Sequence, residues 1–285
     1  MSRPDIAIVG VSCLFPGSVD KTGFWRDILG AKDLCSDIPE THWLIEDYYS
    51  PDPMEPDTTY VKRVPGASGV APIWVEPDGS NRIIVVPGAN GGLTAEDAAT
   101  AVASQEQVDA VIAQFEISQA VTTAGFRAAR ERGATTILNP APGAPVSPEL
   151  AAVSDWIIPN ETEFAIIADA AGLPGDVDDP AAMSGLASHL GARLVVTLGE
   201  RGAALVGADG EISPVETPVV EAVDTTGAGD AFVGAFAFGL ASGWAEADAV
   251  RLGCAIAAES VLRPGTQSSF PAHHRCAEII REVVA

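Results

Sequence analysis

Residues 224–232 read Asp-Thr-Thr-Gly-Ala-Gly-Asp-Ala-Phe and run directly into an apolar segment of mostly small residues, 233–240. The glycines predict a backbone that passes close to a ligand, followed by a buried helix whose first N–H groups are available to an anion such as phosphate. Asp230 falls in that first turn, where a carboxylate can take a proton from a hydroxyl that attacks the phosphate. The alternative is a helix cap formed by Asp and Thr, with glycines that permit tight packing.

On both sides of this stretch, from residue 95 onward, short runs rich in Val and Ile alternate with Ala-rich segments. This pattern is typical of an α/β fold in which a parallel sheet is covered by helices. Parallel strands are predicted over 109–115, 135–138, 156–158 and 193–197. Helices are predicted over 95–103, 120–132, 163–170, 180–190, 228–241, 245–262 and 272–284. An antiparallel hairpin is predicted over 203–206 and 212–218.

The composition excludes several classes of partner. A formal net charge of -23 argues against nucleic acid and against an anionic membrane, because both would repel the protein. The 4 cysteines lack metal-ligand spacing and indicate reduced thiols in a cytoplasmic protein. The apolar run at 6–11 is too short for a signal peptide or a membrane span and predicts a buried strand.

Residues 224–232 resemble the C-terminal signature of the ribokinase-like (PfkB) carbohydrate kinases, and other motifs of that family follow in order from about residue 68 to residue 285. The resemblance implies a ribokinase-like parallel sheet flanked by helices. It also implies ATP-dependent phosphorylation of a sugar hydroxyl, with D-ribose converted to ribose 5-phosphate. The supporting motifs are Gly-Val-Ala-Pro-Ile (69–73), the lid-strand segment 81–90, Gln-Phe-Glu-Ile (114–117), Asn-Pro-Ala-Pro (139–142), Pro-Asn-Glu-Thr-Glu (159–163), Thr-Leu-Gly-Glu-Arg-Gly (197–202) and Gly-Thr-Gln-Ser-Ser (265–269).

The family resemblance assigns catalytic and nucleotide-binding roles residue by residue. Asp230 is the expected general base and also contacts the sugar. Asn160 and Glu163 match a motif that orders Mg²⁺ and phosphate, although helix-start capping would explain the same spacing. The expected anion hole consists of Gly227, Ala228 and Gly229, and the expected nucleotide contacts are Thr197, Gly199 and Gly202.

The same resemblance implies a K⁺ site and a sugar site. Oxygen-only coordination suits a hard monovalent cation. Glu116 is expected to accept sugar hydroxyls, and Ala71 and Ile73 match lid residues that cover the sugar, although both are also explained as ordinary strand residues. The surviving lid strands could form a homodimer. The expected K⁺ positions are Asp224, Thr226, Ser260, Arg263, Gly265 and Ser269.

The beginning of the chain resembles a different family. Segments 6–17, 24–25, 38–43 and 48–53 are similar to the opening of a polyketide synthase ketosynthase domain, a resemblance that covers about 5–62. The expected division is therefore a ketosynthase-like fragment and linker, 1–63, and a kinase domain, 64–285, that lacks its own Asn-x-Asp sugar clamp. Two alternatives stay open: a chimera that binds nucleotide without catalysis, and a polyketide synthase fragment, which is disfavoured because no catalytic Cys and His set follows.

Overall fold

The computed structural model describes residues 69, 73–75, 81–83, 85–207, 209–265 and 267–284. The chain divides into two units, Met1–Leu93 and Thr94–Ala285. In the first unit, β1 (Ile73–Val75) and β2 (Asn81–Ile83) pair antiparallel with Ile73 opposite Ile83, and the 3-10 helix η2 (Gly88–Gly92) follows. Ile73 thus lies in a strand, whereas Ala71 lies outside the described residues.

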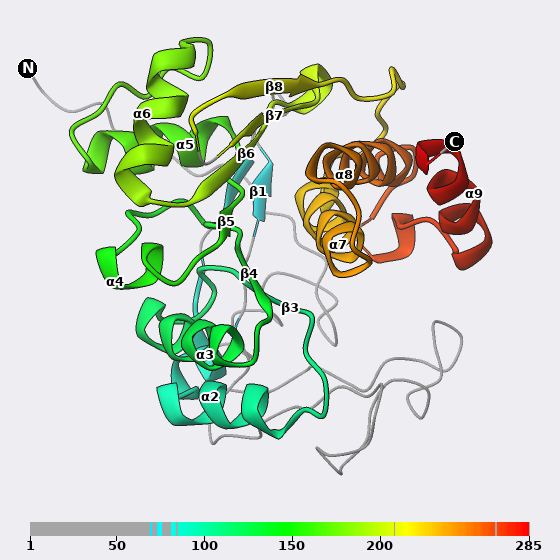
Figure 1. Ribbon diagram of the computed structural model, residues 1–285. Helices are drawn as coiled ribbons and strands as arrows, with labels where there is room; N and C mark the ends of the chain where they lie inside the picture. The colour runs from blue at the N-terminus through cyan, green and yellow to red at the C-terminus, as the bar shows by residue number, and fades with distance from the viewer. Residues whose placement is uncertain are drawn as a thin grey trace, which may run out of the picture. The chain divides into compact units, whose positions relative to one another are not determined.

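The second unit is organised around a six-stranded sheet in the order β3-β4-β5-β6-β7-β8 (Figure 1). β3 to β6 are parallel to one another, and β7 and β8 continue the sheet as an antiparallel hairpin. The carboxyl ends of the four parallel strands therefore meet at one edge of the sheet. The strands are β3 (Ala110–Ala113), β4 (Thr135–Leu138), β5 (Trp156–Ile157), β6 (Arg193–Thr197), β7 (Ala203–Val206) and β8 (Ile212–Val215).

Helices connect the parallel strands, and several begin at a side chain that accepts a first-turn N–H group. Ser118, Ser147 and Asp179 cap α3, α4 and α6 in this way. The helices are α2 (Ala95–Ser104), α3 (Gln119–Glu131), α4 (Pro148–Ala151), α5 (Glu161–Ala170), α6 (Pro180–Leu190), α7 (Ala228–Ala241), α8 (Glu246–Ser260) and α9 (His273–Val284), with short 3-10 turns η3 (Gly199–Arg201) and η4 (Gln267–Ser269).

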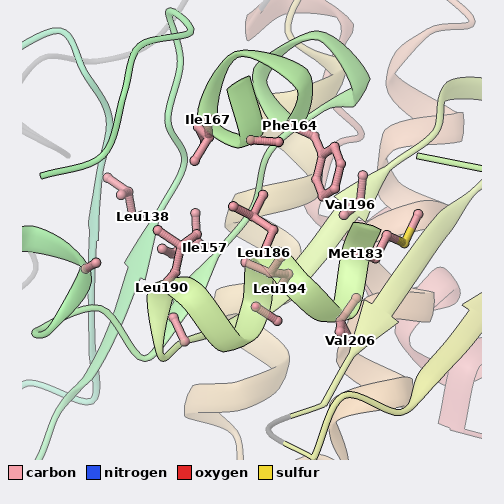
Figure 2. Packing of buried hydrophobic residues seen from close by; sticks show 14 of the residues in the cluster. Leu138, Ile157, Phe164, Ile167, Met183, Leu186, Leu190, Leu194, Val196 and Val206 are labelled. Atoms are coloured by element: carbon pink, nitrogen blue, oxygen red, sulfur yellow. The ribbon is translucent and has the colours of Figure 1, made fainter. Parts of the chain in front are cut away.

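One face of the sheet packs against α3 to α6. Leu194 and Val196 of β6 point into this core, where they meet Phe164 of α5 and Leu186 of α6 (Figure 2). Val195, between them in the sequence, points to the opposite face, as the alternation of side chains along a strand requires. The middle of β6 is therefore buried on both faces, which explains the consecutive apolar residues Leu194–Val196.

The opposite face is covered by α7 and α8. Trp156 of β5 meets Phe236 of α7 edge-to-face, with ring centroids 5.1 Å apart. The two helices approach closely, since a Cβ atom on Gly253 of α8 would lie 2.8 Å from the ring of Phe232. The result is a sheet flanked by helices on both faces, which confirms the predicted fold class.

Most predicted elements occur where the sequence placed them. β4, β6, α6 and α7 have the predicted bounds. β3 is shorter than predicted, α5 begins two residues earlier, and the short helix α4 was not predicted. None of the helices within the described residues is long and apolar enough to cross a membrane.

Candidate active site

Polar residues gather where the four parallel strands end. Gln114 follows β3, Asn139 follows β4, Asn160 lies three residues beyond β5, and Thr197 is the last residue of β6. Asn160 and Thr197 also form a parallel bridge, which brings the third and fourth strand ends together. Open α/β sheets bind ligands at this edge. Two hollows, of about 600 and 340 Å³, lie at the amino-terminal edge instead and contain none of the predicted site residues.

The first turn of α7 is open to a ligand. Its N-cap is Gly227, with φ 82°, and no side chain caps the helix. A Cβ atom added to Gly229 would meet nothing within 4 Å. The alternative of an Asp-Thr cap is therefore wrong. The N–H groups of Gly229 and Asp230, which have no acceptor within their own helix, are available to an anion, whereas that of Ala228 donates to the Thr225 carbonyl at 3.2 Å.

The Asp224 carboxylate joins the loop before α7 to the loop after α8 instead of capping the helix. Oδ1 accepts from the N–H of Thr226 and Oδ2 from the N–H of Gly265, both at 2.9 Å. These donors, Gly265 first, lower the pKa of Asp224 to about 2. The Val261 carbonyl accepts from the N–H groups of Val223 and Asp224 at 2.8 and 3.2 Å. Three of the predicted K⁺ positions are thus brought into direct contact.

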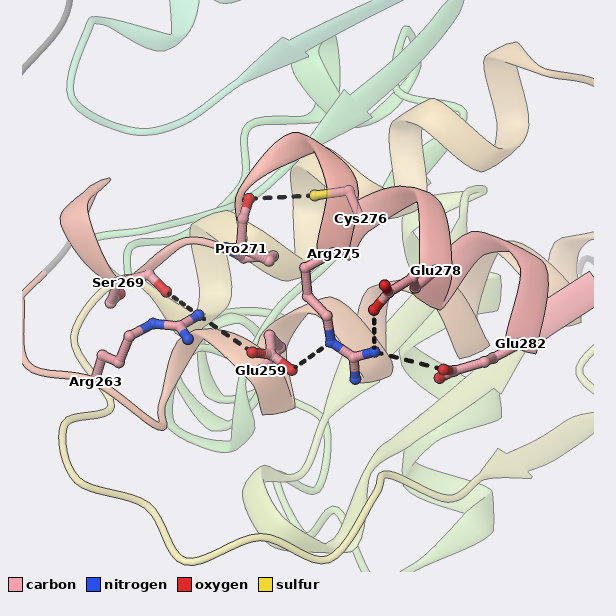
Figure 3. Close-up of polar contacts among 8 residues, drawn as sticks. All are labelled: Glu259, Arg263, Ser269, Pro271, Arg275, Cys276, Glu278 and Glu282. Carbon is pink, nitrogen blue, oxygen red and sulfur yellow. Dashed lines mark hydrogen bonds and ion pairs between the residues drawn. The ribbon is translucent and has the colours of Figure 1, made fainter.

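The remaining predicted K⁺ positions lie at the end of α8, just after it and in η4, and Figure 3 shows two of them, Arg263 and Ser269. Arg263 donates from Nη2 to the Ser269 carbonyl at 3.2 Å and to Oε1 of Glu259 at the same distance. Ser260 is buried, and its hydroxyl donates to the Ala257 carbonyl within its own helix. Among the described residues, no group of three or more His, Cys, Asp and Glu side chains could hold a metal ion, so a K⁺ site here would depend on carbonyl oxygens and Asp224.

Asn160 and Glu163 form a reciprocal capping box at the start of α5. Asn160 Oδ1 accepts from the Glu163 N–H, and Glu163 Oε2 accepts from the Asn160 N–H, both at 2.8 Å. The capping alternative is therefore confirmed. Glu163 is only 6% exposed, and burial raises its pKa although the Asn160 N–H acts in the opposite direction. The Mg²⁺ role of the pair stays a prediction.

The predicted nucleotide residues lie on the turn between β6 and β7. Thr197 ends β6, Gly199 begins η3, and Gly202 has φ 87°. A Cβ atom on Gly202 would lie 2.1 Å from the carbonyl oxygen of Val215, so only glycine fits. Arg201, exposed on this turn, forms ion pairs with Glu161 and Asp178 and thereby ties the turn to the start of α5.

The residues just after β3 include Glu116, which was predicted to bind the sugar, and Gln114, whose contact with Asp230 was not predicted. Glu116 is exposed in the turn that leads to α3. Two residues earlier, Gln114 Nε2 donates to Asp230 Oδ1 at 2.9 Å and to Asn139 Oδ1 at 2.7 Å. Gln114 and Asn139 belong to recognised motifs but had no predicted role. Their positions at the ends of neighbouring strands were the available signal.

Comparison with known proteins gives two matches along the chain. The pfkB family carbohydrate kinase matches residues 57–273, and the N-terminal domain of beta-ketoacyl synthase matches residues 3–71. The two matches overlap at 57–71. Both sequence resemblances are thereby confirmed. The boundary between residues 63 and 64 stays a prediction.

Individual relatives agree with the larger match. A deoxyribokinase of Salmonella typhi is 38% identical over 220 residues, covering 75% of this chain and 70% of the relative. The crystal structure of ribokinase from Thermotoga maritima is 35% identical with a TM-score of 0.67, over 79% of this chain and 73% of that one. The Arabidopsis thaliana ribokinase complexed with ribose and ATP is 27% identical with a TM-score of 0.66, over 76% and 70%.

Proposed function

The chain belongs to the pfkB family of carbohydrate kinases and is a ribokinase-like, ATP-dependent sugar kinase, and we propose that its substrate is D-ribose, phosphorylated to ribose 5-phosphate. The similarity to a ribokinase complexed with ribose and ATP supports ribose as the sugar. The similarity to a deoxyribokinase makes 2-deoxyribose the competing substrate. These two sugars differ by one hydroxyl, so the choice between them depends on the sugar side of the site.

The observation that carries the phosphorylation of a sugar hydroxyl is the position of Asp230 in the uncapped first turn of α7. The N–H groups of Gly229 and Asp230 would bind the transferred phosphoryl group, with the glycine loop 227–229 as the anion hole. Asp230 would accept the proton of the sugar hydroxyl while the oxygen of that hydroxyl forms a bond to the γ-phosphorus. The bond from that phosphorus to the β-phosphate oxygen then breaks, and ADP leaves. One carboxylate and a set of N–H donors at one helix end suit this reaction.

The cofactor assignments extend this proposal to the neighbouring strand ends. ATP would lie along the turn that contains Thr197, Gly199 and Gly202, and Mg²⁺ would be ordered by Asn160 and Glu163, which the capping box holds in place. Monovalent cation binding would use Asp224 and nearby carbonyl oxygens. Because Asp224 contacts both Thr226 and Gly265, a cation bound there would order the loop that leads to Asp230.

The sugar side is the weak point of the proposed enzyme. Glu116 would accept sugar hydroxyls, and Ala71 and Ile73 would belong to the lid, whose strands β1 and β2 could also pair two copies of the chain. Residues 3–71 match a beta-ketoacyl synthase domain, and no Asn-x-Asp clamp occurs there. We therefore expect weak turnover. This same match favours a second candidate function, nucleotide binding without sugar phosphorylation.

Purified protein incubated with Mg-ATP and either ribose or 2-deoxyribose tests the proposal, with sugar phosphate detected by mass spectrometry. Asp230→Asn should lower turnover by on the order of 10² to 10⁴ while ATP affinity in calorimetry stays unchanged. ATP binding without any sugar phosphate would favour the second candidate. Folded protein that binds no ATP would contradict both.

A further inference from the structure

We propose that Gln114 is a positioning residue for Asp230. Its side-chain amide holds one carboxylate oxygen and leaves the other to the substrate hydroxyl, and Asn139 fixes Gln114 in turn. The inference rests on the proposed role of Asp230 as general base. It adds two residues, neither of which contacts the phosphate in the proposed reaction, to the apparatus that orients the base.

Three hydrogen bonds form a continuous chain from the sheet to the helix. Asn139 Nδ2 donates to the Ile158 carbonyl at 2.9 Å, Gln114 Nε2 donates to Asn139 Oδ1 at 2.7 Å, and the same Nε2 donates to Asp230 Oδ1 at 2.9 Å. Gln114, Asn139 and Ile158 follow three neighbouring parallel strands, β3, β4 and β5. The chain of amides therefore spans the strand ends before it reaches α7.

The chemistry of the two ends fixes the direction of every bond in this chain. A backbone carbonyl and an ionised carboxylate only accept, so the groups that face them must be amide N–H donors. With Asn139 Nδ2 turned to Ile158, Oδ1 of Asn139 faces Gln114. The two protons on Gln114 Nε2 then serve one acceptor each, and no exchange of the amide oxygen and nitrogen satisfies both partners.

The backbone around Gln114 is held as well. The Asn139 N–H donates to the Ala113 carbonyl at 2.9 Å, and the Phe115 N–H donates to the Ala141 carbonyl at 2.8 Å. These bonds lie immediately before and after Gln114. Asn139 is only 8% exposed, so its amide has little room to turn. The Gln114 amide that donates to Asp230 is thus positioned by the sheet and not by the loop before α7.

Asp230 itself is exposed in the first turn of α7, where its carboxylate could rotate freely or turn toward the N–H groups at the start of its own helix. The bond from Gln114 restricts both motions and fixes Oδ1. Misplacement of a catalytic group by about 1 Å can cost on the order of 10²-fold in rate. Loss of the amide should therefore lower kcat while the affinity for ATP stays the same.

Gln114→Met removes the donor at similar side-chain length and should lower kcat by about 10- to 100-fold without changing the KM for ATP. Gln114→Glu, which places a carboxylate against Asp230, should lower kcat at least as much. Gln119→Met is the matched control. Gln119 bonds the Pro145 carbonyl at 2.7 Å and the Ser147 N–H at 2.8 Å, so its loss should affect stability and leave kcat unchanged. An active protein in which Gln114→Met keeps the wild-type kcat would overturn the inference.

A stability measurement tests the contact between Gln114 and Asp230 independently of activity. If the protein phosphorylates no sugar, the proposed function is refuted, but this test of the contact still applies. Urea unfolding midpoints are compared for Gln114→Met, Asp230→Ala and the double variant. If Gln114 holds Asp230, each single substitution already breaks the hydrogen bond between them, so the second substitution cannot remove it again. The midpoint shift of the double variant is then smaller than the sum of the two single shifts. Additive shifts would overturn the inference whatever the activity.

Discussion

Alanine at Gly202 should destabilise the protein far more than alanine at Gly199, although both glycines lie on the same turn and both have positive φ angles, 87° and 57°. The two sites differ in their surroundings. A Cβ atom on Gly202 would lie 2.1 Å from the Val215 carbonyl oxygen and 2.9 Å from the Thr217 nitrogen, both backbone atoms, whereas a Cβ atom on Gly199 would meet nothing within 4 Å.

The structure gives a magnitude for each variant. At Gly199, alanine bears only the cost of a left-handed residue, about 1–2 kcal/mol. At Gly202 the sparsely populated conformation, φ 87° and ψ -125°, costs about 1–3 kcal/mol. The backbone shift of roughly 1 Å that relieves the clash adds about 1–3 kcal/mol, as for an overpacked core. The expected total of about 2–6 kcal/mol is a large part of a typical stability of about 5–15 kcal/mol.

Urea unfolding followed by circular dichroism measures both effects. With a slope of about 2 kcal/mol/M, the Gly202→Ala midpoint should fall by about 1–3 M and the Gly199→Ala midpoint by less than about 1 M. ATP affinity should follow the same order, because Gly202 connects the predicted nucleotide turn to β7. Equal midpoints for the two variants would show that β8 moves aside at little cost, and the steric argument would be wrong.

Three further predictions concern ionisable groups. Burial raises the pKa of Glu163 above 4.5, so ionisation of this carboxyl opposes folding once the pH exceeds 4.5. The Glu163→Gln variant should therefore gain stability relative to wild type between pH 4.5 and 7. A difference in urea midpoints that stays constant over this range would contradict the prediction. Burial also raises the pKa of Cys254 to about 11, which leaves roughly one thiolate in a thousand at pH 8, and peptide mapping after alkylation should find Cys254 modified only in unfolded protein. Replacing K⁺ by tetramethylammonium should weaken ATP turnover or ATP binding in the wild-type protein, and the Asp224→Asn variant should not respond to the change of cation. Identical turnover and binding of the wild-type protein with either cation would remove the K⁺ assignment.

Local patterns were enough to predict most of the fold. The bounds of β6 could be predicted because the apolar residues Leu194–Val196 lie between Arg193 and Thr197, and the end of α7 because its largely apolar sequence stops before Ser242 and Gly243. The start of α5 was predicted two residues too late, because capping by Asn160 was considered only as an alternative to metal binding and was not used to place the first residue of the helix. The helix α4 was missed because four residues carry no periodicity, although Ser147 before Pro148 is a typical helix start.

The candidate site could be predicted only in part, because its contacts join residues that are far apart in the sequence. The strand-end positions of Asn160 and Thr197 follow from the alternation of strands and helices. Gln114 and Asp230, in contrast, are separated by 116 residues, and Asp224 and Gly265 by 41. Which strand lies beside which helix decides these pairs, and no local pattern contains that information.

The two aspartates of the stretch 224–230 are both held by donors from distant parts of the chain. Gly265, with Thr226, holds Asp224 at the beginning of the loop, and Gln114 holds Asp230 at its end. Between them, Gly227 and Gly229 contribute no side chain that could occupy the helix N-terminus. The loop is therefore fixed at both ends and open in the middle, as anion binding requires. Disturbing its beginning should weaken ATP binding through the loop conformation, whereas disturbing its end should lower kcat through the base.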